Sequence, residues 1–199
     1  MPRRLACLLM LGLLLAPPAL ARPPAPPEAE RAIPGRPGWS VAADSGCWIW
    51  NPNSKEGETL AFTGPCPAGP AEGEGEGVWR WTEDGKAEVE RFGGTLRNGR
   101  LDGQGWYEFG EGDRYDGGFR ANDFHGHGVH VWPGGRRYEG MWEDDFPHGQ
   151  GVYTDPDNRV AGMWRSGCFF EGGQLVMAIG REDDECVAFI PRLAPPLRP

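Results

Sequence analysis

The chain has 199 residues, and its 29 acidic and 20 basic residues give a formal net charge of −9. This balance argues against nucleic acid and membrane lipid as partners, because phosphate backbones and anionic headgroups both favour basic surfaces. The 32 glycines and the lack of a convincing amphipathic helical pattern indicate an all-β fold.

Residues 1–21 have the pattern of a signal peptide. Arg3 and Arg4 precede an apolar run over residues 5–16, and small residues lead to a cleavage position at Ala21. The run is too short for a membrane-spanning helix. We therefore predict an exported protein, periplasmic or secreted after cleavage near Ala21, with an uncleaved anchor as the alternative.

Two segments follow the predicted leader. Residues 22–38 are rich in proline and are expected to form an extended, flexible linker. Residues 39–91 are expected to form an N-terminal cap that includes a degenerate first repeat. This copy has 15 residues between Gly77 and Phe92, where a later copy has 10, which indicates an insertion of five residues.

A repeat of ~23 residues occupies residues 92–173. Phe92, Tyr115 and Tyr138 are spaced 23 residues apart, and Val160 follows after 22. Each opening residue is followed by a glycine and a large apolar residue, and in the first three units a run with alternate glycines comes next. The residues that define the repeats are Phe92, Gly94, Gly103, Gly105, Tyr115, Gly117, Phe119, His125, Gly126, Gly128, Tyr138, Gly140, Trp142, His148, Gly149, Gly151, Gly162 and Trp164. Such periodicity predicts a stacked repeat architecture.

The segments that begin at Tyr115 and Tyr138 resemble MORN (membrane occupation and recognition nexus) repeats. That family has the pattern Tyr-x-Gly-x-Trp, a spacer and His-Gly-x-Gly, and the units at residues 92–114 and 160–173 match it less completely. The opening around Cys47 is also similar to that of exported bacterial MORN proteins. The resemblance implies roles in protein–protein assembly, with proposed lipid contacts.

Each unit is expected to form a β-hairpin in an elongated, single-layer antiparallel sheet with disulfide-pinned caps. In one unit, strands over residues 115–120 and 128–132 flank a turn near residues 122–126. The glycines are expected to admit the aromatic ring of a neighbouring hairpin over bare backbone. Residues 174–190 are expected to form a C-terminal capping hairpin, followed by a flexible tail at residues 191–199.

Four cysteines remain if the leader with Cys7 is removed. Export favours disulfides, and four cysteines allow three connectivities. We predict Cys47–Cys66 and Cys168–Cys186, because each pair is local and the two pairs bracket the repeats. A metal or redox site is the alternative, although neither pair has Cys-x-x-Cys spacing.

No catalytic, metal or cofactor site is predicted. His125, His127 and His130 lie close in sequence, but residues three apart on a strand point to opposite faces, so the histidines are read as structural. No serine lies in a nucleophile-elbow motif. Outside the repeats, the cap and the C-terminal segment are shorter than a typical catalytic domain.

The chain has nine Trp, nine Phe and four Tyr residues, and a single-layer sheet exposes part of such a set. We expect a candidate binding ridge composed of Trp79, Trp81, Trp106 and Trp132. The favoured function is a non-catalytic exported scaffold that binds another protein or its own copy. The alternative is a module that binds a cell-envelope glycan or a lipid headgroup through these aromatic residues.

Overall fold

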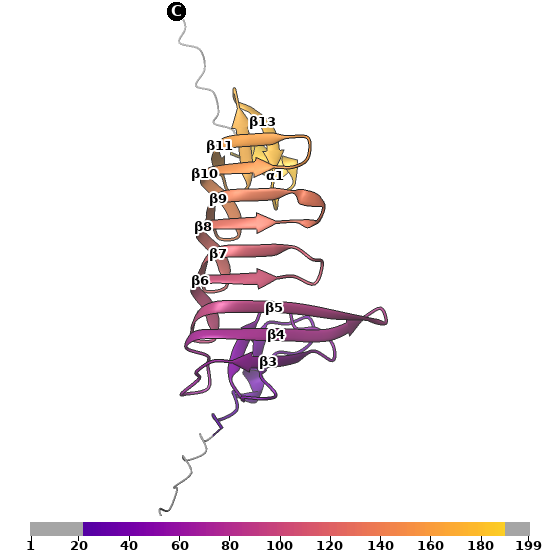
Figure 1. Cartoon of the computed structure of the whole chain (residues 1–199), viewed down its shortest axis with the longest axis vertical. Coiled ribbons are helices and arrows are strands. Elements are labelled where there is room, and N and C mark those ends of the chain that lie inside the picture. Colours follow the sequence, from indigo (N-terminus) through magenta and orange to yellow (C-terminus); the bar gives the residue numbers. More distant parts are fainter. Residues whose placement is uncertain (1–21, 190–199) are drawn as a thin grey trace, which may run out of the picture.

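The computed structural model describes residues 22–189, and an antiparallel sheet of eleven strands dominates it (Figure 1). Strands that follow one another in sequence lie side by side throughout this sheet, which confirms the all-β repeat fold. The strands are β3 (Thr59–Thr63), β4 (Gly73–Glu83), β5 (Lys86–Arg97), β6 (Arg100–Glu108), β7 (Arg114–Arg120), β8 (Asp123–Val131), β9 (Arg137–Glu143), β10 (Phe146–Thr154), β11 (Arg159–Arg165), β12 (Cys168–Glu171) and β13 (Gln174–Ala178). The predicted leader, residues 1–21, and tail, residues 191–199, lie outside the described residues.

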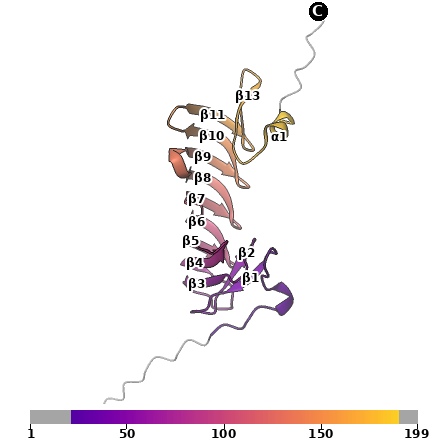
Figure 2. The ribbon, with the colours of Figure 1, turned by 90° about the vertical axis from the view of Figure 1, so that its right-hand side faces the viewer.

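The N-terminal cap lies against one face of the sheet. Its strands β1 (Gly38–Val41) and β2 (Trp48–Asn51) form a separate two-stranded sheet, and Figure 2 shows them on the same side of the large sheet as α1 (Asp183–Val187) at the other end. We call this side the core face and the opposite side the outer face. The sheet is thus a shallow curved wall with a structured element over each end of its core face.

The expectation of an extended linker over residues 22–38 is wrong, because this segment folds back on the cap. The Trp48 indole donates a hydrogen bond to the carbonyl of Pro24 at 2.8 Å, and the Trp39 indole donates one to Glu30 at 3.3 Å. A 3-10 turn, Glu28–Glu30, lies between these contacts. Tryptophan indoles need hydrogen-bond acceptors when they are partly buried, and the proline-rich segment supplies them.

The glycines do admit aromatic rings, both from a neighbouring unit, as Phe92 over Gly77 and Phe119 over Gly105, and within one hairpin. A Cβ atom on Gly128 of β8 would overlap the ring of Tyr115, which lies on the partner strand β7. Gly151 of β10 has the same relation to Tyr138 of β9. Tyr115 and Tyr138 therefore each close their own hairpin, a contact that the sequence-based expectation of rings from neighbouring hairpins did not include.

The second aromatic residue of each unit makes the contact between hairpins. The Trp142 ring meets Tyr115 of the preceding hairpin edge-on at 5.5 Å, and its indole donates to the carbonyl of Gly128 at 3.2 Å. Trp164 meets Tyr138 in the same way at 5.2 Å. Edge-to-face aromatic packing of this kind contributes about 0.5–1.5 kcal/mol beyond burial. In these units the tyrosine thus packs within its own hairpin, whereas the tryptophan packs against the preceding hairpin.

The hairpin turns lie earlier than predicted. The turn between β7 and β8 is the pair Ala121-Asn122, with φ values of 54° and 85°, and not residues 122–126. Two consecutive positive φ angles are the signature of the tight hairpin turn that matches strand twist. Asn122 also binds the preceding hairpin, because its side chain accepts a hydrogen bond from the Leu101 amide and its own amide donates to the Leu101 carbonyl.

The predicted insertion in the first repeat lengthens a hairpin instead of forming a loop. Strands β4 and β5 remain paired from Gly73–Leu96 to Glu83–Lys86, and their tip projects beyond the other hairpins (Figure 1). The extra residues carry Trp81 and Glu88 out along this projection. The degenerate copy therefore forms an extended arm at the cap end of the sheet.

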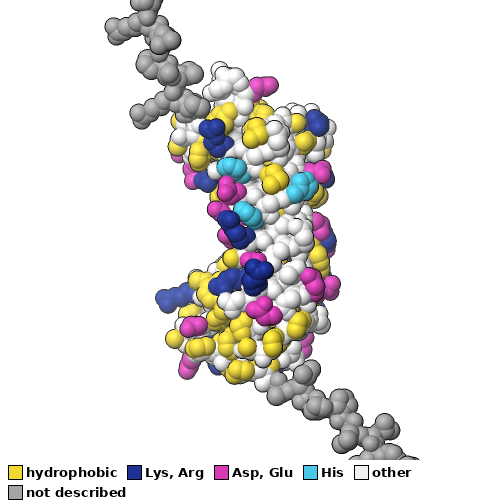
Figure 3. Space-filling model, turned by 90° about the vertical axis from the view of Figure 1, so that its left-hand side faces the viewer, with side chains coloured by type: hydrophobic (Ala, Val, Ile, Leu, Met, Phe, Trp, Pro, Cys, Tyr) yellow, Lys and Arg dark blue, Asp and Glu magenta, His cyan; other side chains and the backbone are white. Residues whose placement is uncertain are grey.

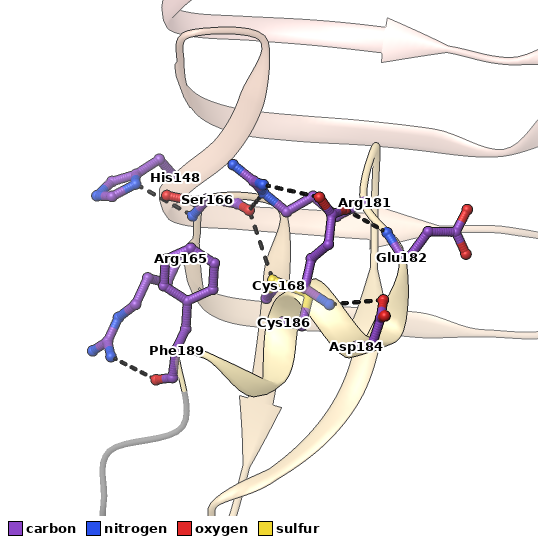
Figure 4. Close-up of a disulfide and its surroundings, with 10 residues drawn as sticks. His148, Arg165, Ser166, Cys168, Arg181, Glu182, Asp184, Cys186 and Phe189 are labelled. Atoms are coloured by element: carbon purple, nitrogen blue, oxygen red, sulfur yellow. Dashed lines mark hydrogen bonds and ion pairs between the residues drawn. A yellow bond between two sulfur atoms is a disulfide. The ribbon is translucent and has the colours of Figure 1, made fainter.

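The predicted capping hairpin over residues 174–190 is wrong. Strand β13 pairs with β12 through the Gly172-Gly173 turn, and the chain then forms the single helical turn α1. A capping box between Glu182 and Glu185 satisfies amides at the start of α1 (Figure 4). Acidic residues in a first helical turn also favour the positive end of the helix dipole.

Both predicted disulfides are present. Cys47–Cys66 joins the start of β2 to the loop after β3, and Cys168–Cys186 joins β12 to α1 (Figure 4). The Arg181 side chain donates to the carbonyl of Ser166 at 2.6 Å beside the second bridge. Among residues 22–189, no helix has the length and apolar character needed to cross a membrane.

Candidate functional site

A groove of about 1040 Å³ lies between the N-terminal cap and the core face of β4 to β8. Figure 3 shows the hollow that separates the cap end from the upper strands. We call it the acidic groove, because its lining includes aromatic rings and nine carboxylate side chains, namely those of Glu58, Glu83, Asp84, Glu88, Glu90, Glu111, Asp113, Asp123 and Asp145. The cap is required for its shape, since Trp50, Pro52 and Lys55 line one wall.

The cap wall is anchored to a hairpin turn of the sheet. The Trp50 amide donates a hydrogen bond to the carbonyl of Gly99 at 2.9 Å. The Trp39 ring packs so closely on Gly99 that a side chain there would contact it at 2.5 Å. The guanidinium of Arg100 stacks on the Trp50 ring at 4.4 Å, a favourable cation–π contact.

Aromatic residues from successive strands form the floor of the groove. The Phe92 ring stacks on Tyr107 at 6.1 Å, and Tyr107 meets Phe109 at 4.5 Å. The Tyr107 hydroxyl donates to Glu90 at 2.5 Å. Burial, together with the negative charge of Glu90, raises the pKa of Tyr107 well above its usual value, so the phenol stays a neutral donor. This contact holds the Glu90 carboxylate over the aromatic floor.

Glu58 connects the cap to the floor. Its carboxylate accepts hydrogen bonds from the Asn51 side chain at 2.6 Å and from the Lys55 amide at 3.2 Å. Burial raises the pKa of Glu58, and the negative charge of Glu90 adds to the effect. The negative charges of Glu58 and Glu90 therefore repel each other, and no lysine or arginine side chain forms an ion pair with either carboxylate in the described part of the chain.

His130 closes the far wall of the groove. The residue is 7% exposed, and its Nε2 atom lies 2.8 Å from an oxygen of Asp113. Phe109 packs beside it at 6.0 Å. Burial lowers the pKa of His130, while Asp113 acts in the opposite direction and raises it. Burial is the larger effect, so neutral imidazole is the favoured form in the fold.

Replacement Asp113→Asn is expected to lower the pKa of His130 further, because it removes the group that stabilises the imidazolium. In the wild-type protein the pKa should already lie below 6.5. The folded state then binds the proton less readily than the unfolded chain, so the stability contributed by His130 is complete above pH 6.5 and declines as the pH falls below it. An NMR titration of the imidazole measures both values; a pKa that rises in the variant contradicts the assignment.

The other histidines do not join His130 in the groove. His127 pairs with Met141 on the outer face, whereas His130 pairs with Tyr138 on the core face. The His148 Nδ1 atom accepts a hydrogen bond from the Ser166 amide at 3.4 Å (Figure 4). Over residues 22–189, no group of three or more His, Cys, Asp or Glu side chains is placed to hold a metal ion.

The structure does not form the contiguous ridge predicted from four tryptophans. Trp79 is only 5% exposed and belongs to the core, and Trp81 and Trp132 pack partly buried on the core face. Trp106 lies on the outer face, where the Arg114 guanidinium stacks on it at 4.9 Å. Alternation within a strand cannot by itself tell whether residues on two different strands share a face. The strand pairing is needed to place Trp81 and Trp106 on opposite faces of the sheet.

The outer face has a different electrostatic character from the groove. Several of its carboxylates are paired with arginines: Arg114 contacts both Glu108 and Asp116, and Arg137 lies 2.8 Å from Glu139, whereas Glu74 and Glu76 form no ion pair among the described residues. A shallower hollow on this face is lined by bare glycine backbone and Trp106. The acidic groove is thus the deeper concave site, and nine carboxylate side chains line it, against three (Glu74, Glu76 and Asp116) in the outer hollow.

The family model described as MORN repeat matches residues 94–114, 115–135 and 138–158. These segments cover the end of β5 with β6, then β7–β8 and β9–β10, and the last two hairpins carry the tyrosine and glycine contacts described above. No curated protein matches the chain.

Proposed function

Because residues 94–158 consist of three MORN repeats, a module that commonly mediates protein or membrane interactions, we propose that this chain is an exported, non-catalytic scaffold that binds another polypeptide. The acidic groove is the docking site. The observation that carries the proposal is the roof of β1 and β2 over an aromatic floor, which makes a concave site of about 1040 Å³. Concave, aromatic-lined sites with a few polar groups are typical of recognition surfaces.

Export is supported by the two disulfides and by the leader-like pattern of residues 1–21. MORN repeats are in general non-catalytic, and the titratable groups of the groove form a wall of carboxylates rather than a paired nucleophile and base. The acidic charge of the chain favours a polypeptide partner over an anionic lipid.

A displayed library of random peptides, selected on the oxidised protein, tests the proposal. Gly110 lines the groove, so Gly110→Phe places a ring inside it, while Val131→Phe adds the same ring to the outer face. Selected peptides are expected to bind Gly110→Phe at least tenfold more weakly and Val131→Phe unchanged. Equal binding to both variants, or binding only to cell-wall glycan or anionic vesicles, would contradict docking of a polypeptide in the groove.

A further inference from the structure

The charges that line the acidic groove are strongly unequal. Nine carboxylates face only two basic side chains, Lys55 and Lys86. In the part of the chain that the structure describes, Glu58, Glu88 and Glu90 form no ion pair with any lysine or arginine. On the outer face, Glu108, Asp116 and Glu139 do have arginine partners, whereas the larger number of carboxylates in the groove has no lysine or arginine partner in the described residues.

One point of the groove is surrounded by groups that suit a cation. The position that a Cβ atom on Gly110 would occupy lies 3.4 Å from an oxygen of Glu88, 3.5 Å from the Trp81 ring and 3.8 Å from an oxygen of Glu90. Carboxylates and an indole around open space provide both charge attraction and a cation–π contact. The absence of a side chain on Gly110 leaves this space open.

The carboxylates also extend along the groove. Glu111 lies before β7 begins, and Asp123 and Asp145 lie beyond its other end. Strand β7 has seven residues, so these charges are separated by roughly 23 Å. A single compact cation can contact the carboxylates at only one end of the groove, whereas an elongated ligand with several positive groups can contact those at both ends.

Burial and neighbouring carboxylates raise the pKa of two of these side chains, although Arg120 acts in the opposite direction on Asp123. Burial raises the pKa of Asp123, and the neighbouring Asp144 adds to the effect. Burial likewise raises the pKa of Asp145, which also feels Asp123. A cation that enters the groove stabilises the ionised forms and relieves this repulsion.

We propose that the acidic groove binds an extended polypeptide segment rich in lysine or arginine, with one cationic side chain placed between Trp81, Glu88 and Glu90. This inference rests on the proposed function and specifies its ligand. Complementary charge accelerates association and selects partners, and the aromatic floor supplies the apolar contact that charge alone lacks. The roughly 23 Å between the terminal carboxylates corresponds to about seven extended residues.

The test uses acetylated and amidated octalysine, octaglutamate and free spermine as probes of the full oxidised chain. Glu88→Gln combined with Glu90→Gln removes two groove charges and keeps an acceptor for the Tyr107 hydroxyl. Glu74→Gln combined with Glu76→Gln removes two charges from the outer face of the adjacent strand β4. Fluorescence anisotropy gives the affinities, and thermal unfolding verifies that each variant is folded.

Octalysine is expected to bind, to weaken as salt is added, and to lose about tenfold in affinity in the groove variant, with at most a twofold loss in the outer-face variant. The indole NMR signal of Trp81 should shift on binding. Equal losses in both variants, or binding of octaglutamate, would overturn the inference. Spermine binding without octalysine binding would overturn the polypeptide assignment. Groove-dependent library peptides without lysine or arginine would refute the cationic ligand and leave the proposed function intact.

Discussion

Replacement of Gly151 by alanine is expected to lower the free energy of unfolding by about 3 kcal/mol, because the added methyl group overlaps the Tyr138 ring and hydroxyl. Gly151 lies in the middle of β10 and pairs with Gly140 on one side and Gly162 on the other, so the backbone has neighbours that prevent it from moving away. Since small domains have only about 5–15 kcal/mol of stability, a loss of this size is readily measured by urea denaturation.

Gly110→Ala is the matched control for this prediction. A Cβ atom at Gly110 meets nothing closer than 3.4 Å, so the cost should remain within about 1 kcal/mol. A double-mutant cycle identifies the cause: Tyr138→Ala should cost less in the Gly151→Ala background than in the wild type, because the ring that clashes is gone. If Gly151→Ala were as stable as Gly110→Ala, the tyrosine-over-glycine contact would have no structural importance.

The repeat architecture was predictable from sequence because it depends on local spacing. The aromatic residue, the glycine two positions later and the ~23-residue period specify strand faces and hairpin order without knowledge of distant contacts. The same locality made Cys47–Cys66 and Cys168–Cys186 the simplest pairings, and both are confirmed. The family resemblance agrees with the three MORN repeats matched within residues 94–158.

The acidic groove was not predictable in this way, because it forms between segments that are distant in sequence. Trp50 on the cap and Phe109 on β6–β7 line one hollow only because β1 and β2 fold over the sheet. The sequence signal that was available is the pair of acidic residues Glu88 and Glu90, which lie on the core face of β5. Its meaning depends on the strand register, which places these positions opposite aromatic side chains.

The two errors at the chain ends have a common physical reason. Residues 22–38 were expected to be mobile from their proline content, but the indoles of Trp39 and Trp48 fix them through hydrogen bonds. Residues 174–190 alternate in a way typical of strands, yet the Glu182–Glu185 capping box favours a helical turn. In both cases side-chain hydrogen bonds decided the local structure over composition and apolar pattern.

Removal of the Cys47–Cys66 bridge by paired serine substitutions is expected to lower the free energy of unfolding by about 3 kcal/mol and also to weaken groove binding. The bridge closes a loop with a sequence separation of 19, which in the chain-entropy model accounts for the stability loss. Without it, hydrogen bonds such as Trp50 to Gly99 and Ala43 to Leu60 hold the cap on the sheet. A cap that opens more often reduces the population of the complete groove and lowers the apparent affinity for octalysine in proportion.

The second bridge separates these two effects. Cys168–Cys186 has a sequence separation of 18, so its removal should cost nearly the same free energy of unfolding in denaturation experiments. However, it joins β12 to α1 at the opposite end of the sheet and contributes no residue to the groove lining. Octalysine affinity should therefore fall only in the Cys47→Ser and Cys66→Ser variant. An equal fall in both variants would show that binding follows global stability, and the cap would then have no specific role in forming the groove.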